Sequence, residues 1–318
     1  QHINALFSPF KQFFMQILPE IQNEYGRLDA VVVGLATRMG GVPELEECYD
    51  ARSYESVKLG RFPKEESCNS QLERLIGILE KNGVKVLYPS LIQSLNQVFS
   101  RDIAFVIEDQ YIIPNVIADR AKERDAMSEI EENIPSWNII MMPNGCFAEG
   151  GDVIMDNDHV FVGVSNDETF DRYKTARTNI RGMEYLADEF PAKEFKGFEL
   201  HKDDRDPLKG SLHLDCAFQP IGGGALIAPH LFKNESDVQW LIERYGETNV
   251  YRCSPEEAYS LATNVFSFSP KDIIVSAKCE AMQHWLRERG LNVHSIVYDE
   301  IVKMGGLLRC TTMPLKRV

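Results

Sequence analysis

A short supersecondary unit recurs along this chain: an apolar strand, a polar or glycine-rich turn, a second apolar strand and then a helix. Three of the turns lie at 156–159, 222–224 and 269–272, and they consist of Asp, Asn, His, Gly, Ser, Pro and Lys. Such clusters between β-branched runs are typical of β-hairpins. One unit of this kind cannot bury its apolar faces alone, so neighbouring units are expected to pack against one another.

Helices are predicted between the strand pairs. In 71–82 the apolar residues Leu72, Leu75 and Leu79 recur at helical spacing, and Gly83 is placed to end the helix. Further helices are expected at 181–190, 236–245 and 280–289. The chain therefore alternates paired strands with helices, which indicates an α/β protein.

One polar residue stands before or at the head of each of four strand pairs. These residues are Asp102, Glu149, His213 and Asn264, and they are 47, 64 and 51 residues apart; Cys310 follows after a further 46 residues. A period near 50 predicts a closed, roughly five-fold arrangement, a five-bladed α/β propeller built from ββαβ repeats. Corresponding strand ends would then converge on one axis. Four unrelated hairpins in an α+β protein are the alternative.

Composition narrows the classes of partner. The 318 residues are 26% charged and 44% hydrophobic, as in a soluble globular protein, and we expect one domain over 1–318. The formal charge of −14 argues against nucleic acid and against an anionic membrane surface, while it suits a cationic small substrate. No apolar stretch reaches membrane-spanning length, and the opening 1–19 lacks the pattern of a signal peptide.

The seven cysteines contain no Cys-x-x-Cys pair. Their wide spacing predicts neither a metal site nor a disulfide scaffold, so a cytoplasmic protein with no cofactor and no metal is expected. Cys310 follows Gly305 and Gly306, which allow a close backbone approach, and Arg309 could favour a thiolate if its side chain points to the sulfur. The alternative for this residue is a small buried hydrophobe.

His213 and Asp215 belong to the segment 212–218, which is expected to form one strand. Alternation along a strand would place both side chains on the same face, where a carboxylate can orient an imidazole or bind a cation beside it. A core histidine satisfied by a neighbouring group is the alternative.

Two acidic residues precede other strands. Glu149 is followed by Gly150 and Gly151, which could leave room for a ligand at a strand mouth, and Asp102 stands directly before an apolar strand. A simple turn and an exposed loop acid are the alternatives.

Taken together, two carboxylates, a His-x-Asp pair and a late cysteine fit one reaction. A guanidinium ion is planar, charged at neutral pH and forked, so paired carboxylates can hold it through two parallel hydrogen bonds. A thiolate can then attack its central carbon, and a histidine can protonate the departing amine.

At these positions the sequence resembles the pentein superfamily of guanidino-group-modifying enzymes, which comprises arginine deiminases, dimethylarginine dimethylaminohydrolases and amidinotransferases. Four motifs occur in family order: 99–102 (Phe-Ser-Arg-Asp), 147–153 with Glu-Gly-Gly-Asp, 212–215 with His-x-Asp, and 305–315 around the cysteine. The resemblance implies a five-bladed α/β propeller, in agreement with the repeat.

The resemblance also implies roles for single residues. Cys310 would be the nucleophile and His213 the general acid and base, while Asp102 and Glu149 would hold the substrate guanidinium. Asp215 would lie beside the substrate or support His213. Arg177, in a segment similar to an Arg-Thr-Asn element of the hydrolases, would bind a substrate carboxylate. A surface arginine at a helix start is the alternative for Arg177.

Two segments depart from that pattern or extend it. The stretch 166–175 resembles an insertion before Arg177, and 34–43, rich in glycine, is expected to be a lid over the mouth of the site.

Three functions stay open at this point. A deiminase-like hydrolase of an arginine-like substrate is favoured by Glu149 and by the ending 309–315, whereas 23–28 leading into the first strand is more like the amidinotransferases. Both would pass through an amidino-cysteine intermediate. The third possibility is a pentein that only binds a partner. The presence of the cysteine, the histidine and the acidic residues together argues against it. The sequence is compatible with a homo-oligomer and leaves the substrate tail open.

Overall fold

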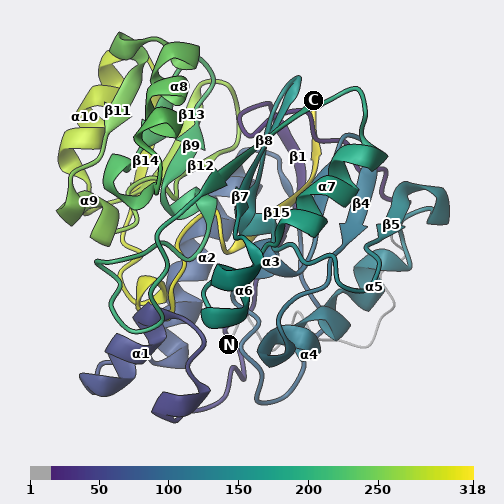
Figure 1. Ribbon diagram of the computed structural model, residues 1–318. Coiled ribbons are helices and arrows are strands. Elements are labelled where there is room, and N and C mark those ends of the chain that lie inside the picture. Colours follow the sequence, from purple (N-terminus) through teal and green to yellow (C-terminus); the bar gives the residue numbers. More distant parts are fainter. Residues whose placement is uncertain (1–15) are drawn as a thin grey trace.

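The computed structural model describes residues 16–318, and this part of the chain forms five three-stranded sheets with helices around them (Figure 1). The strands of the five sheets are β15 (Thr312–Arg317), β1 (Leu28–Val33) and β2 (Lys85–Leu87); β3 (Phe105–Ile107), β4 (Gln110–Ile113) and β5 (Ile139–Met141); β6 (Val153–Asp156), β7 (His159–Val164) and β8 (Glu194–Glu199); β9 (Phe218–Pro220), β10 (Ala225–Ile227) and β11 (Val250–Arg252); β12 (Phe266–Ser267), β13 (Asp272–Ser276) and β14 (Asn292–Ile296).

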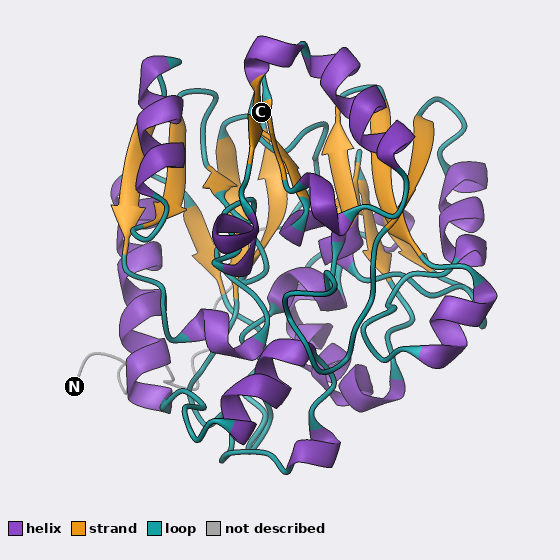
Figure 2. Cartoon of the chain, turned by 60° about the vertical axis from the view of Figure 1, so that its left-hand side comes forward, coloured by secondary structure: helices purple, strands orange, loops and turns teal. Residues whose placement is uncertain are grey.

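Every sheet repeats one pattern. Its first two strands pair antiparallel and its last two pair parallel. The parallel pair requires a crossover, and helices supply it in each repeat. Figure 2 shows the strands grouped side by side with helices outside and below them. The predicted five-bladed α/β propeller with ββαβ repeats is confirmed.

The α-helices are α1 (Ala51–Lys58), α2 (Glu65–Lys81), α3 (Ser100–Ile103), α4 (Ala121–Arg124), α5 (Ser128–Glu131), α6 (Asp167–Arg172), α7 (Ile180–Glu189), α8 (Glu235–Tyr245), α9 (Pro255–Tyr259) and α10 (Glu280–Glu288). The expected helices over 181–190, 236–245 and 280–289 match α7, α8 and α10 within about one residue. The helix expected over 71–82 begins six residues earlier, because its polar first turns carry no apolar periodicity.

The ring is closed by the two ends of the described chain. β15, the last strand, lies antiparallel to β1, the first, with Val31 opposite Pro314 and Val33 opposite Thr312 (Figure 1). This pairing places Cys310, two residues before β15, at the head of an antiparallel strand pair whose second strand is β1. Cys310 therefore occupies in the last repeat the position that Asp102, Glu149, His213 and Asn264 occupy in the others.

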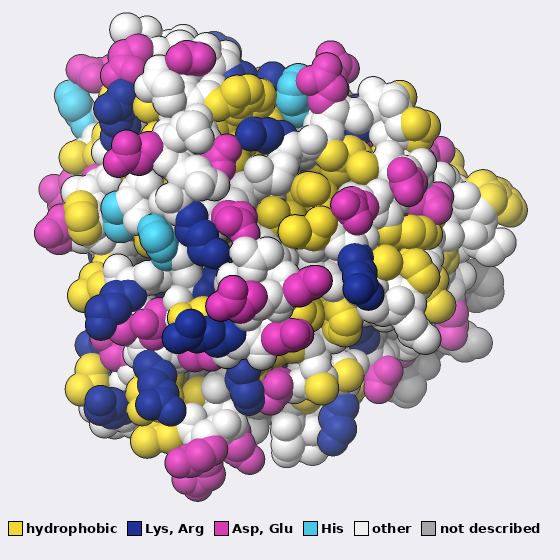
Figure 3. Space-filling view, in the orientation of Figure 1, with side chains coloured by type: hydrophobic (Ala, Val, Ile, Leu, Met, Phe, Trp, Pro, Cys, Tyr) yellow, Lys and Arg dark blue, Asp and Glu magenta, His cyan; other side chains and the backbone are white. Residues whose placement is uncertain are grey.

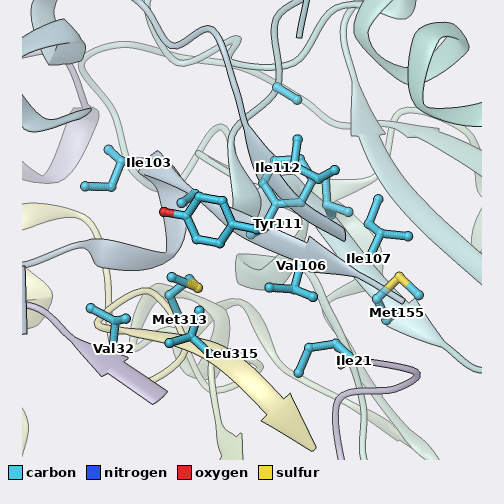
Figure 4. Close-up of a cluster of buried hydrophobic side chains, with 14 of the residues drawn as sticks. Ile21, Val32, Ile103, Val106, Ile107, Tyr111, Ile112, Met155, Met313 and Leu315 are labelled. Atoms are coloured by element: carbon cyan, nitrogen blue, oxygen red, sulfur yellow. The ribbon is translucent and has the colours of Figure 1, made fainter. Parts of the chain in front are cut away.

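Apolar side chains from several repeats fill the space between the sheets. Figure 4 shows one such cluster, to which β1 contributes Val32, β3 Val106, β4 Tyr111 and β15 Met313, all buried. Removing these side chains from water stabilises the packing of one blade against the next. It also holds the strand ends, from which the polar residues project, in fixed relative positions.

On the face seen in Figure 3, acidic and basic side chains are interspersed with white and apolar areas. No helix among residues 16–318 is both long enough and apolar enough to cross a membrane. Most of the opening segment that the sequence analysis compared with signal peptides lies outside the described residues.

One expected strand is wrong. Residues 212–218 do not form a single strand: His213 is extended, a 3₁₀ turn follows over Leu214–Cys216, and β9 begins at Phe218. The physical reason is a hydrogen bond from the Leu214 amide to the carboxylate of Asp152 (2.9 Å), which together with the turn takes the backbone out of any ladder. The segment 166–175 contains α6, which Asn166 caps by accepting the Thr169 amide.

Candidate active site

Four of the residues that stand at the heads of the strand pairs are buried where the blades meet. Asp102 lies in α3, Glu149 and His213 each precede a single 3₁₀ turn, and Cys310 precedes β15. Each is at most 2% exposed, although carboxylates and imidazoles ordinarily lie at the surface. Buried polar groups of this kind need partners, and the partners define the site.

His213 lies between the two carboxylates expected to hold a guanidinium. Its Nε2 is 2.8 Å from Oε2 of Glu149, and its Nδ1 is 3.7 Å from Oδ1 of Asp102. Burial lowers the pKa of His213, but the charge of Asp102 and the contacts with Cys310 and Glu149 outweigh it and hold this pKa well above its usual value. These surroundings therefore favour the protonated form of the imidazole.

The two glycines after Glu149 are required by close packing. A Cβ on Gly150 would lie 2.1 Å from the carbonyl oxygen of Arg101, and a Cβ on Gly151 would lie 2.6 Å from Nδ1 of His213. Real Cβ atoms do not approach other atoms so closely. The room that the glycines leave is therefore filled by the backbone at Arg101 and by the imidazole, rather than by a ligand as the sequence suggested.

The sulfur of Cys310 lies in acidic surroundings. The carboxylate oxygens of Asp215 are 3.6 and 3.8 Å from Sγ, and the thiol of Cys216 is a neighbour. Contact with Cys216, burial and the charge of Asp215 raise the pKa of Cys310 well above its usual value, while His213 lowers it. The net effect of these surroundings favours the protonated thiol form of Cys310.

Asp215 is held by Arg309 instead of pairing with His213. Nη1 of Arg309 lies 2.9 Å from Oδ2 of Asp215, and its Nη2 lies 2.9 Å from Oε1 of Glu24. The expected shared face of His213 and Asp215 is lost because the 3₁₀ turn rotates the second residue out of alternation. Arg309 thus points to these two carboxylates and not to the sulfur, where the sequence analysis considered it.

Arg120 is the main residue that the sequence reasoning missed. Its Nη1 lies 2.8 Å from Oδ2 of Asp102 and 2.8 Å from Oε2 of Glu149, and its Nε and Nη2 bond to both oxygens of Glu123. Its side chain is 2% exposed. A basic residue in an Ala-Asp-Arg-Ala loop carries no sequence signal of burial, so no pattern marked it. The site thus already holds one guanidinium between the expected pair of carboxylates.

Arg177 reaches the same carboxylate from another side. Its Nη1 lies 3.0 and 2.9 Å from the two oxygens of Glu149, and its Nη2 donates to the carbonyl of Tyr49 at 2.7 Å. Burial raises the pKa of Glu149, but the positive charges of Arg177 and Arg120 and the contact with His213 lower it far more, so this residue is a carboxylate. The alternative of a surface arginine is wrong, since Arg177 is fully buried. Tyr49 follows the expected lid at 34–43, whose role stays a prediction.

Two groups of side chains of ligating type occur in the described part of the chain: Asp102, Glu149 and His213; and Asp215, Cys216 and Cys310. In the first group Arg120 and Arg177 already supply positive charge to Glu149. In the second, Arg309 does the same for Asp215. The carboxylates of both groups are thus already paired with buried arginines.

The family profile described as "N,N dimethylarginine dimethylhydrolase, eukaryotic" matches residues 55–317. The chain belongs to this family. It is a pentein, one of the guanidino-modifying enzymes, as the four ordered motifs indicated. The matched range contains each candidate site residue from Asp102 to Cys310.

Individual relatives are more distant. The chain is 28% identical over 298 residues to the uncharacterized protein YkgA of Bacillus subtilis, covering 93% of this chain and 94% of YkgA. It is 22% identical over 272 residues to an arginine deiminase of Listeria welshimeri, covering 72% of this chain and 64% of the deiminase. The chain thus spans less than two thirds of that relative.

A solved structure shows the same fold. SxtG, an amidinotransferase from Microseira wollei, superposes with a TM-score of 0.72 at 17% identity, over 94% of this chain and 97% of SxtG. At this level of identity the likeness shows the fold and not the reaction.

Proposed function

We propose that this protein is a cysteine-dependent hydrolase that acts on the guanidino group of arginine or an arginine derivative. The observation that carries the proposal is the position of Arg120: one of its nitrogens bonds to Asp102 and Glu149 at 2.8 Å each, beside His213. The two carboxylates are therefore spaced to hold a guanidinium. In the proposed reaction, the guanidinium of the substrate takes the place of the Arg120 nitrogen.

Binding exchanges one guanidinium for another. Arg120 keeps two bonds to Glu123, 3.0 and 2.7 Å long, so its Nη1 can release Asp102 and Glu149 while the side chain stays anchored. The substrate fork then bonds to both carboxylates with charge-assisted hydrogen bonds. Its positive charge next to the sulfur favours the thiolate, so Cys310 loses its proton to solvent as the substrate enters.

The first half of the reaction breaks a C–N bond. The Cys310 thiolate attacks the central carbon of the guanidinium and forms a C–S bond. The imidazolium of His213 gives its proton to the departing nitrogen, which leaves as ammonia or, from a methylated substrate, as a methylamine. The product of this step is an amidino group on Cys310, and His213 is now neutral.

The second half uses water. Neutral His213 takes a proton from a water molecule as its oxygen attacks the amidino carbon, and the C–S bond then breaks with the electron pair returning to sulfur. The second proton of the water leaves to solvent, so the products are a neutral ureido compound and an enzyme with thiolate and imidazolium restored. Every group used lies on the described chain, and no cofactor enters.

An amidinotransferase is the second candidate. The segment 23–28 that favoured it contains Glu24, whose carboxylate bonds to Arg309 and so belongs to the surroundings of Asp215. In that reaction an amine takes the place of water in the second half, and the first half is unchanged.

Product analysis tests the proposal. The protein is incubated with arginine, with monomethyl- and asymmetric dimethylarginine, and with agmatine, each with and without glycine as amine acceptor, and products are measured by mass spectrometry. We expect a ureido product and ammonia or methylamine without acceptor. Release of the amine product with amidino transfer, seen only with acceptor, would assign the transferase instead.

The control is Cys310→Ser, which keeps the shape of the site and lacks the thiol. It should form no product from any of these substrates. A Cys310→Ser protein as active as the wild type would contradict the mechanism, and no product from wild type with any guanidino compound would favour a protein that only binds a partner.

A further inference from the structure

The side chain of Asn264 connects directly to the proposed nucleophile. This residue precedes β12 in the fourth repeat, and it is fully buried. Its Nδ2 lies 3.2 Å from Sγ of Cys310. Its Oδ1 accepts the backbone amides of Arg309 (2.9 Å) and Cys310 (3.3 Å).

The contacts fix which way the amide faces. A backbone N–H can only donate a hydrogen bond, so the atom that faces the amides of Arg309 and Cys310 must be the side-chain oxygen. The –NH₂ group of Asn264 then faces the sulfur. Unlike many buried amides, this one has an orientation that its neighbours determine.

The backbone before Asn264 forms a turn that holds this residue beside Cys310. Leu261 adopts a left-handed conformation (φ 54°), and the Asn264 amide donates to the Leu261 carbonyl at 3.0 Å. The hydroxyl of the adjacent Thr263 donates to the carbonyl of Asp215 at 2.9 Å. One short turn thus ties the loop carrying Asp215 to the loop carrying Cys310.

We propose that Asn264 is a positioning residue of the reaction, whose amide donates a hydrogen bond to the Cys310 thiolate and holds the nucleophile loop. The proposal rests on the proposed function, in which that thiolate attacks. The sulfur otherwise faces Asp215 and the thiol of Cys216, with His213 and the Tyr298 hydroxyl nearby. Since Asp215 opposes negative charge on sulfur, a neutral donor fixed toward it offsets part of that effect.

The test separates the donor from the loop contacts. Asn264→Asp keeps an oxygen for the two backbone amides and replaces the –NH₂ group with an oxygen that cannot donate when ionised. Asn264→Ala removes both. The matched control is Asn138→Asp, at another buried asparagine, whose Nδ2 donates to the carbonyl of Asp109 at 2.8 Å.

The measurement is the rate of alkylation of Cys310 by iodoacetamide from about pH 6 to about pH 10. Peptide mass spectrometry identifies the modified cysteine, and Cys310→Ser supplies the background. Loss of a hydrogen bond to a charged group shifts a pKa by about one to two units. Below the midpoint the rate follows the thiolate fraction, so we expect alkylation of Asn264→Asp to be about tenfold or more slower than that of the wild type at each pH in this range.

Equal alkylation of wild type and Asn264→Asp at every pH, including no alkylation of either, would overturn the proposal. A carboxylate at 264 also slows alkylation by its charge, so slower alkylation in the uncharged Asn264→Ala is required as well. Should Asn264→Ala fail to fold, Asn264→Leu, which is uncharged and of similar size, takes its place. The assay uses no guanidino substrate, so it tests the hydrogen bond to the Cys310 thiolate even if the protein proves to have no hydrolase activity. If turnover is found, the proposal also expects Asn264→Asp to lower kcat while KM changes less than twofold, since the amide does not touch Asp102 or Glu149.

Discussion

Nη1 of Arg120 lies 2.8 Å from Oε2 of Glu149, in the place where the proposed reaction requires a substrate nitrogen. The same carboxylate oxygen is 2.8 Å from Nε2 of His213. One oxygen thus links the guanidinium position to the proton donor. A guanidinium of the chain itself thus occupies the place proposed for the substrate, which leads to the first prediction.

Arg120→Ala should lower the free energy of unfolding by about 3–5 kcal/mol, because it leaves Asp102, Glu123 and Glu149 buried without their shared partner. Methylguanidinium, which fits the vacated place, should raise the melting temperature of the variant more than that of the wild type. Differential scanning calorimetry with and without the ligand measures both effects.

The control for this rescue is Arg124→Ala, which removes a partly buried arginine bonded to Glu131 at 2.7 Å on the next turn. It should lose less stability and gain no more from methylguanidinium than the wild type gains. Equal gains in all three proteins would show that the pair of carboxylates does not select a guanidinium.

Gly151→Ala should reduce kcat about a hundredfold or more. The new Cβ would lie 2.6 Å from Nδ1 of His213 and 2.9 Å from Oδ1 of Asp102, so the imidazole must move, and displacements of about 1 Å carry costs of this size. Gly77→Ala is the matched control: it lies in α2 with nothing within 4 Å of the added Cβ. That variant should gain about 0.5–1 kcal/mol of stability and keep full activity. Comparable activity in both variants would disprove the packing argument.

Acid should destabilise the protein through Glu24. Burial raises the pKa of this carboxyl, but the charges of Arg309 and Arg101 outweigh burial and lower the pKa from 4.5 to about 2. A depressed pKa gives stability that is present above pH 4.5 and is lost as the pH falls through about 2. The shift corresponds to about 3 kcal/mol at neutral pH.

Urea unfolding as a function of pH measures this contribution. Glu24→Gln should be less stable at neutral pH, and its free energy of unfolding should change less between pH 4.5 and about 2 than that of the wild type. Glu20→Gln is the control, because the Glu20 side chain is about half exposed and pairs with Lys316 at the surface. A Glu24→Gln protein with the wild-type pH dependence would refute the assignment.

The fold could be predicted from the sequence because its signal is periodic. Strand pairs followed by helices at a spacing near 50 residues indicated a closed ring, in which the residues at the head of each pair would converge. The position of Asn264 followed from the same period, although its contact with Cys310 did not. A repeat fixes which backbone positions are equivalent, but not the direction of each side chain.

The rest of the site depends on contacts that no local pattern records. Arg120 and Glu24 enter it from segments outside the repeated hairpins, and their roles arise from ion pairs across long sequence separations. His213 and Asp215 were assigned to one strand face because alternation was the local rule. The turn that breaks this alternation forms together with a hydrogen bond from the Leu214 amide to Asp152. Asp152 belongs to another blade, so the local sequence around His213 does not reveal this bond.

The most direct test of the account is a search for the covalent intermediate. The wild-type protein is mixed with arginine or a methylated arginine, quenched in acid during turnover, and analysed by intact-protein and peptide mass spectrometry. We expect an added amidino group on Cys310 that disappears when substrate is exhausted and never forms in Cys310→Ser. Turnover without any adduct on Cys310, at a rate that Cys310→Ser retains, would contradict it.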